Sequence, residues 1–427
     1  MKLRELKIKK NPKTIIWFNL YFTCVFGFLR DILKFPGFIV YFIDLISFGT
    51  FLWVIMIHPK KIANKKFHII IFWFLLFLVI TFTSSLVNDK FSILQFLWGF
   101  RNTFRFYIFF ITCYWIMDKN DVNSVSIFFK RLFYINVLLV ILEFAIGYRG
   151  DNIGGSFGVS SGCNAYLNLF MVICASIFIC DYLDKKISTK KLVIVILGLL
   201  ICSATSELKI FVIELPCIVL LAMWNSNYSI RKIGLFLLGF FSIFLGITLM
   251  GYIFEGSDLN FYLSGKVFEY MGDGGYTGVG DLSRFNAIFK INDLFFFNTD
   301  KFLFGFGLGN CSYSSFAFLT SSFFNNYSWM HYHWFADSMI FLETGAIGLF
   351  LFETFFILIF LSCRKYIKIT RKDKQETIFK YGAIISILSI VISIYDMSLL
   401  MESAYMIYFI FALIYVNIDR LLKQNSK

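Results

Sequence analysis

The sequence predicts an all-α polytopic membrane protein. Hydrophobic residues make up 58% of its 427 residues and charged residues only 16%. Soluble globular domains are closer to half apolar and a quarter charged, so this composition excludes a water-soluble fold around a single core. The apolar residues form continuous runs that do not alternate with polar ones. Such runs favour helices over the strands of a barrel.

About 12 apolar runs are long enough to cross roughly 30 Å of hydrocarbon as transmembrane helices, which takes about 20 residues. They lie near residues 14–29, 37–58, 67–86, 93–117, 128–148, 163–182, 190–206, 208–225, 233–254, 336–363, 381–397 and 401–418. No small-residue cleavage site follows the first run, so we interpret it as an uncleaved span and not as a signal peptide.

The runs divide the chain into three parts. Residues 1–254 hold nine N-terminal transmembrane helices, residues 255–335 form one large polar and aromatic loop, and residues 336–427 hold three C-terminal transmembrane helices and a tail. A protein that only spans a membrane has no need of such a loop, so we expect function to concentrate there.

Lysine and arginine predict the orientation, because they are enriched in cytoplasmic loops. Placing the N-terminus inside assigns 29 of the 40 Lys and Arg residues to the cytoplasmic side. The even number of spans brings the C-terminus back to that side, so the 255–335 loop is predicted to be extracytoplasmic.

The net charge of +13 does not indicate a nucleic-acid partner, because the basic residues flank the spans and suit contact with membrane lipids. The glycine clusters at 272–280 and 305–310 follow neither a strand nor a GK[ST] pattern, so no nucleotide site is predicted. His331 and His333 lack the further ligands that would complete a metal site. We therefore expect no metal and no cofactor.

The predicted outer face carries few cations. Arg101 and Arg105 are four residues apart and share a helix face, where they either bind a substrate or extend to the membrane interface. Lys209 lies in SATSELK between two apolar runs, where an ionisable residue indicates a functional site unless Glu207 neutralises it.

Four segments together carry a family resemblance. HYHWFADSMIFLETGAIG (331–348) resembles the His, hydrophobic, Glu-x-Gly-x-x-Gly signature of the bacterial O-antigen and capsule polysaccharide polymerase (Wzy-type) and O-antigen ligase superfamily. SRFNAIFKINDLFFFNTDKFLFGFGLGN (283–310) resembles its pattern of an arginine, an amphipathic stretch and a Gly-x-Gly-x-Gly turn. GGSFGVSSGCNAYLNLF (154–170) is similar to its Gly-Phe turn, and SATSELK (203–209) occupies the place of a Ser-x-Ser-Arg or lysine motif.

The resemblance implies a C-type glycosyltransferase-like fold and a metal-independent inverting glycosyltransferase. It would polymerise oligosaccharide repeat units of O-antigen, capsule or exopolysaccharide at the outer face of the bacterial plasma membrane. The implied partners are undecaprenyl-diphosphate-linked oligosaccharide, membrane lipids and, as in many members, a chain-length regulator. An O-antigen ligase shares these motifs. A lipid-linked oligosaccharide flippase, from another class, would have shorter outer loops.

The resemblance also suggests roles for seven residues. Histidine suits a base that deprotonates the acceptor hydroxyl, which makes His333, or failing that His331, the catalytic candidate beside Glu343. The same histidines could instead belong to an aromatic belt at the interface, and Glu343 could be a helix-packing acid. Cations would stabilise the departing diphosphate, and the substrate-binding candidates are Arg284, Lys209, Arg101 and Arg105.

Overall fold

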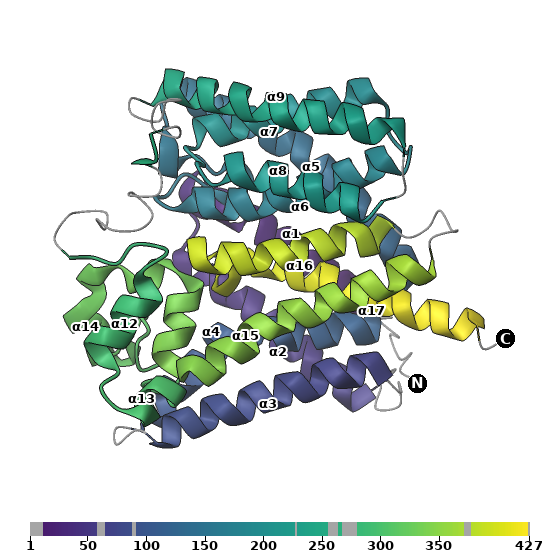
Figure 1. The fold of residues 1–427 in the computed structure, drawn as a ribbon. Coiled ribbons are helices and arrows are strands. Elements are labelled where there is room, and N and C mark those ends of the chain that lie inside the picture. The colour runs from purple at the N-terminus through teal and green to yellow at the C-terminus, as the bar shows by residue number, and fades with distance from the viewer. Residues whose placement is uncertain are drawn as a thin grey trace, which may run out of the picture.

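The computed structural model describes residues 12–57, 65–87, 91–226, 229–254, 264–266, 280–370 and 377–425. Its regular elements in these residues are all helices (Figure 1). The N-terminal helices are α1 (Pro12–Asp31), α2 (Val40–Ile57), α3 (Lys65–Val87), α4 (Ile93–Ile116), α5 (Lys119–Ile146), α6 (Cys163–Leu183), α7 (Thr189–Thr205), α8 (Phe211–Trp224) and α9 (Ile230–Ile253). The short helices α12 (Ala287–Phe295), α13 (Thr299–Phe304) and α14 (Ser322–Tyr327) precede α15 (Ala336–Ile369), α16 (Thr377–Tyr395) and α17 (Ala404–Asn425).

Eight helices in these residues are long and apolar enough to cross a membrane: α2, α3, α5, α6, α9, α15, α16 and α17. This confirms the predicted all-helical class and its membrane-spanning character. Every one of the twelve predicted runs coincides with a helix, but α7 and α8 have only 17 and 14 residues, and α4 carries Arg101 and Arg105. The number of spans therefore stays a prediction.

Local hydrogen bonds move one helix boundary well away from its predicted place. α5 begins at Lys119, whereas the apolar run predicted a start near 128. The Asp118 side chain accepts from the backbone N–H of Asn120 at 2.8 Å, and the Asp121 side chain accepts from the N–H of Asp118 at 2.8 Å. This capping box satisfies N–H groups that a helix end leaves without partners, so the helix begins in polar sequence.

Burial separates central helices from peripheral ones. In the most apolar 18-residue stretch of each helix, 89% of the residues of α6 and 78% of those of α17 are buried inside the protein. The corresponding share in α2 and in α3 is 28%. The apolar residues on α2 and α3 that no helix covers are the surface expected to face lipid. α6 and α17 therefore form the interior of the bundle, where their polar residues must find partners in the protein.

The two ends of the bundle differ in character. The short helices α12, α13 and α14 gather at one end, and the last turns of α17 lie at the other, which we call the terminal end (Figure 1). At the terminal end, loops that the charge pattern assigns to the cytoplasm meet: Lys380 pairs with Asp184, and Lys186 donates to Thr377. The described residues 280–335 of the predicted extracytoplasmic segment thus lie at the end opposite these basic loops, whereas most of 255–279, with most of the 272–280 glycine cluster, lies outside the described residues.

Candidate functional site

The predicted glycine-rich turn docks on an interruption in α15. Gly345 has a non-helical backbone, with φ 67° and ψ −168°, inside that helix. The carbonyls of Leu342 and Glu343, just before it, accept hydrogen bonds from the N–H groups of Phe306 and Gly307 at 2.8 and 2.9 Å. The interruption at Gly345 breaks the helical hydrogen-bond pattern of these two carbonyls, and the N–H groups of the turn bond to them instead. The two motifs of the resemblance are therefore one packed unit.

The Glu343 carboxylate lies inside this unit. Its side chain is buried, and Oε1 accepts hydrogen bonds from the N–H of Cys311 at 3.2 Å and from Ser312 Oγ at 2.7 Å. The Tyr332 hydroxyl donates to the carbonyl of Cys311 at 2.7 Å. Glu343 is thereby connected through residue 311 to the segment that carries both histidines. The contacts of Glu343 are therefore those of a residue that positions the glycine-rich turn and the segment of the two histidines.

The two histidines have different surroundings. The His331 ring stacks on Trp334 with centroids 3.8 Å apart, and its Nδ1 lies 3.3 Å from Oδ2 of the buried Asp281. His333 packs against Phe324, and its Nδ1 is buried with no hydrogen-bond partner among the described residues. Burial, with a contribution from His331, lowers the pKa of His333 to about 4. At neutral pH His333 is therefore a weak proton acceptor, whereas His331 is oriented by a carboxylate.

Arg284 lies against the end of α16. Its Nε donates to the carbonyl of Tyr395 at 3.1 Å, and its guanidinium lies 4.1 Å from the centre of the Tyr395 ring. Asp396 follows directly and interacts electrostatically with Arg284. Asp396 also accepts from the N–H of Ser398 at 2.8 Å. The predicted substrate cation thus contacts a loop that the sequence did not single out.

Arg101 and Arg105 share one carboxylate. Asp44 of α2 accepts from Arg101 Nε at 2.7 Å and from Arg105 Nη1 at 3.1 Å. Arg105 also pairs with Glu402 at 3.0 Å, and Tyr405 donates to Asp44 at 2.7 Å. The side chain of Arg105 is 2% exposed and that of Arg101 is 18% exposed. Arg101 is therefore the more accessible cation, while Arg105 is held inside by two acids.

The sequence reasoning missed Asp44 and Glu402 as functional candidates. Asp44 is an acid within an apolar run, and such a residue by itself signals a site or a buried partner. Arg105 is 61 residues from Asp44 and 297 from Glu402, so no local spacing could reveal either pairing.

Lys209 lies in the turn between α7 and α8 and pairs with Glu207 at 3.0 Å. This ion pair is the neutralisation of Lys209 by Glu207 that the sequence left open. Asn164, on the first turn of α6, donates to the carbonyl of Ser206 in this turn at 3.1 Å. Two residues along α6, Tyr166 donates to Glu402 at 3.2 Å. The Lys209 turn and the arginine cluster therefore contact neighbouring positions of the same helix.

These groups are joined by the short connection between α16 and α17. We call it the 395–405 segment. Arg284 contacts its start through Tyr395, and Arg105 contacts its far part through Glu402 and through the carbonyl of Leu400 at 3.1 Å. The structure thus places three of the four predicted cations, Arg284, Arg101 and Arg105, at this connection or at a carboxylate bound to it.

No group of three or more His, Cys, Asp or Glu side chains that could hold a metal ion occurs in the part of the chain described. In the comparisons, no protein-family model matches this chain, and no curated protein matches it. The family resemblance therefore stays a prediction from motifs.

Proposed function

We propose that this chain polymerises undecaprenyl-diphosphate-linked oligosaccharide repeat units by inverting glycosyl transfer. In this proposal the chain has twelve spans, the 255–335 loop faces outward, and both termini are cytoplasmic. The observation that carries it is the gathering of Arg101, Arg105 and Arg284 around the 395–405 segment, which Arg284 reaches from just before α12.

Arginines at this position suit a diphosphate leaving group. The guanidinium presents paired donors to phosphate oxygens and keeps its charge at any physiological pH. Arg101 is the candidate for direct contact, because it is the more exposed of the pair and lies 4.8 and 4.9 Å from the ring centres of Tyr41 and Trp98. Arg105, buried between Asp44 and Glu402, would fix the position of the groups around it.

The second requirement is a base for the acceptor hydroxyl. In the tautomer in which His331 Nδ1–H donates to Asp281, Nε2 is the proton acceptor. The hydroxyl oxygen then bonds to the anomeric carbon, the bond from that carbon to the diphosphate oxygen breaks, and the hydroxyl proton passes to His331. The departing diphosphate carries away the negative charge. The low pKa of His333 makes that residue a weak base at neutral pH, and the contact with Asp281 orients the His331 ring.

The test is polymerisation by the purified full-length chain in lipid nanodiscs, supplied with an undecaprenyl-diphosphate-linked repeat unit. The expected product is a ladder of polymer lengths. His331→Phe keeps an aromatic ring on Trp334 but no base, and should reduce turnover by roughly 10²–10⁴. Lys290→Ala removes a cation from α12 and serves as the control, with turnover within about twofold of the unaltered chain.

Each other result has a distinct meaning. Transfer of a single unit to a separate acceptor, with no ladder, would indicate a ligase. Full turnover by His331→Phe would place the base elsewhere. An intact donor after incubation with the unaltered chain would show that the proposed function is wrong.

A further inference from the structure

An aromatic cluster lies beside Arg101, the cation proposed to contact the diphosphate. The guanidinium carbon of Arg101 lies over the rings of Tyr41 in α2 and Trp98 in α4. A third ring, Phe316, comes from the segment that follows the glycine-rich turn. Phe316 stacks on Tyr41 with centroids 5.9 Å apart, and it meets Trp98 nearly at a right angle with centroids 6.5 Å apart. We call Tyr41, Trp98 and Phe316 the aromatic corner.

Phe316 is the most accessible ring of the aromatic corner. Its exposed fraction is 46%, which is high for a large apolar side chain that stacks on another ring. Tyr41 and Trp98 are both partly buried, and both contact Arg101. A ligand held at Arg101 therefore meets Phe316 as the ring with the most free surface.

Hydroxyl groups lie at the edge of the aromatic corner. The Tyr41 hydroxyl and Ser315 Oγ are 2.6 Å apart. One of the two donates to the other, so the second can still donate, and both oxygens can accept. The indole Nε1 of Trp98 donates to the carbonyl of Tyr313 at 3.0 Å. The polar groups of both partly buried rings thus contact the 313–316 segment.

The segment that carries Phe316 is held by its own hydrogen bonds. The N–H of Phe316 donates to Ser314 Oγ at 3.1 Å, and the Thr320 hydroxyl donates to the carbonyl of Ser314 at 2.8 Å. Together with the contacts to Tyr41 and Trp98, these bonds fix the Phe316 ring in place. A ligand that stacks on a ring already fixed loses little binding free energy to ordering it.

A sugar ring suits this arrangement. One face of a pyranose carries C–H bonds of slight positive charge, which match the negative face of an aromatic ring. Its hydroxyls project from the edge, where they can bond to the Tyr41 and Ser315 hydroxyls. An isoprenoid chain would use the ring face but has no group to match those hydroxyls.

We propose that the aromatic corner is the subsite for the sugar bonded directly to the diphosphate of the lipid-linked donor, with Phe316 as the stacking ring. This inference rests on the proposed function, because it takes Arg101 as the contact of the diphosphate. The sugar shares a bond with that diphosphate, so a donor held at Arg101 places its first sugar beside the corner.

The experiment compares lipids that differ only in the sugar. Dissociation constants are measured for the full-length chain in neutral detergent with radiolabelled undecaprenyl diphosphate, alone or bearing one N-acetylglucosamine or one galactose. The sugar contribution is the ratio of the constant for the bare lipid to that for the sugar-bearing lipid. In the unaltered chain at least one sugar should contribute about threefold or more. A ratio of one for both sugars would show that the subsite is wrong.

Replacements of Phe316 test the stacking. Phe316→Leu keeps an apolar side chain without the ring, and should reduce the sugar contribution by about threefold to tenfold while binding of the bare lipid stays unchanged. Phe316→Trp keeps an aromatic face and should retain the sugar contribution. An unchanged ratio in Phe316→Leu would overturn the proposal. An equal loss for the bare and sugar-bearing lipids would assign the ring to the isoprenoid chain and would also overturn it.

A second variant decides the matter if a thermal unfolding scan shows that Phe316→Leu does not fold. Ser315→Ala removes an exposed hydroxyl at the edge of the corner. It should reduce the sugar contribution by about twofold to tenfold, because one hydrogen bond is lost. An unchanged ratio in Ser315→Ala would then count against the subsite.

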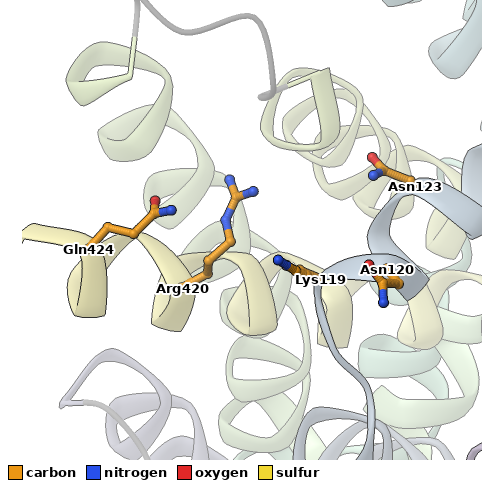
Figure 2. A pocket seen from close by; sticks show the side chains of 5 residues that line it. All are labelled: Lys119, Asn120, Asn123, Arg420 and Gln424. Atoms are coloured by element: carbon orange, nitrogen blue, oxygen red, sulfur yellow. The ribbon is translucent and has the colours of Figure 1, made fainter.

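Two controls lie away from the aromatic corner. Phe289→Ala removes a ring that is 70% exposed on α12. Asn123→Ala shortens an exposed side chain at a pocket of about 410 Å³ near the other end of α4, where α5 meets α17 (Figure 2). Both variants should keep the sugar contribution of the unaltered chain. A loss in either control equal to that in Phe316→Leu would show that the effect is not specific to the corner.

The binding measurement separates this inference from the proposed polymerase activity. If the sugar contribution depends on Phe316 but no polymer forms in nanodiscs, the polymerase proposal fails and the subsite stands. If polymer forms but Phe316→Leu keeps the full sugar contribution, the subsite fails and the polymerase proposal stands. Binding of neither the bare nor the sugar-bearing lipid would defeat both.

Discussion

The buried charges of this protein are satisfied by partners far away in sequence. Arg105 has almost no exposed surface and contacts Asp44 of α2 and Glu402 of the connection that precedes α17. An unpaired ion inside a helix bundle would be costly, so each such cation requires a nearby acid. The sequence revealed the cations, because they interrupt apolar runs. The acids that hold them could be identified only from the folded chain.

Replacing Asp44 tests this dependence. Asp44→Asn keeps the shape of the side chain but leaves the Arg105 guanidinium with less compensation, and it should destabilise the fold by about 3–5 kcal/mol. Denaturant or thermal unfolding in mild detergent measures the change. The control is Asp151→Asn, which alters an exposed carboxylate and should cost no more than about 1 kcal/mol. Similar losses in both variants would mean that the buried pair has no special role.

The low pKa of His333 makes stability depend on pH. Burial, with His331 nearby, lowers this pKa from its ordinary 6.5 to about 4, so the fold favours the neutral ring. Between these values the unfolded chain binds more protons than the folded one, and stability falls as the pH falls from 6.5 to 4. The unfolding midpoint should therefore drop more between pH 7.5 and pH 5 in the unaltered chain than in His333→Phe. Parallel pH curves would contradict the low pKa.

At the scale of elements, the interruption of α15 explains why two glycine motifs lie so close in space. A Cβ atom at Gly305 would lie 2.6 Å from the carbonyl oxygen of Leu342, and one at Gly345 would lie 2.4 Å from the carbonyl carbon of Leu303. The turn and the helix approach each other through bare backbone, and side chains at these positions would separate them.

Gly345→Ala should therefore destabilise the fold by about 2 kcal/mol or more, because an alanine there has both a positive φ and a backbone clash. Gly49→Ala is the matched control. Gly49 lies inside α2 with open space around it, so alanine there should be neutral or stabilise the helix by up to about 1 kcal/mol. The two unfolding midpoints, measured in the same detergent, check the prediction. It would be wrong if Gly345→Ala unfolded at the temperature of the control.

The sequence predicted the positions of the long helices better than the details of their ends. Continuous apolar runs identify helix interiors, because the hydrophobic requirement is strong and local. The early start of α5 depends on the capping box at Asp118, and polar residues before an apolar run do not reveal it. The helices of the 280–335 segment were also missed. They are short, and α12 and α13 pack on α15, so tertiary contacts decide their structure more than local pattern does.

The sequence likewise predicted only part of the candidate site, because a motif shows which residues are unusual but not what surrounds them. Short motifs with unusual polar residues identified Arg284, His331 and Glu343, because such residues are conspicuous in an apolar chain. The roles of Glu343 and His333 depend on surroundings that no motif contains. The hydrogen bonds from Cys311 and Ser312 direct the Glu343 carboxylate to the turn, and burial makes His333 a weak base.

For the whole molecule, the central prediction is its orientation in the membrane. In intact cells, a membrane-impermeant maleimide should label Asn325→Cys in α14, whereas Lys190→Cys should react only after the cells are permeabilised. Both positions are exposed. The nine natural cysteines are free, and all are buried except the partly buried Cys217, so background labelling should be low. Labelling of Lys190→Cys alone in intact cells would reverse the topology and defeat the proposed function.

The 395–405 segment has a consequence for engineering this protein. Surface loops usually accept insertions, and a short loop between two membrane helices is a common place for a tag or reporter. Here Arg284 contacts one end of the loop and Arg105 the other. The segment is therefore held by an arginine near each end. Added residues would displace Tyr395 or Glu402 from its arginine, so an insertion there would perturb the candidate site as well as report on topology.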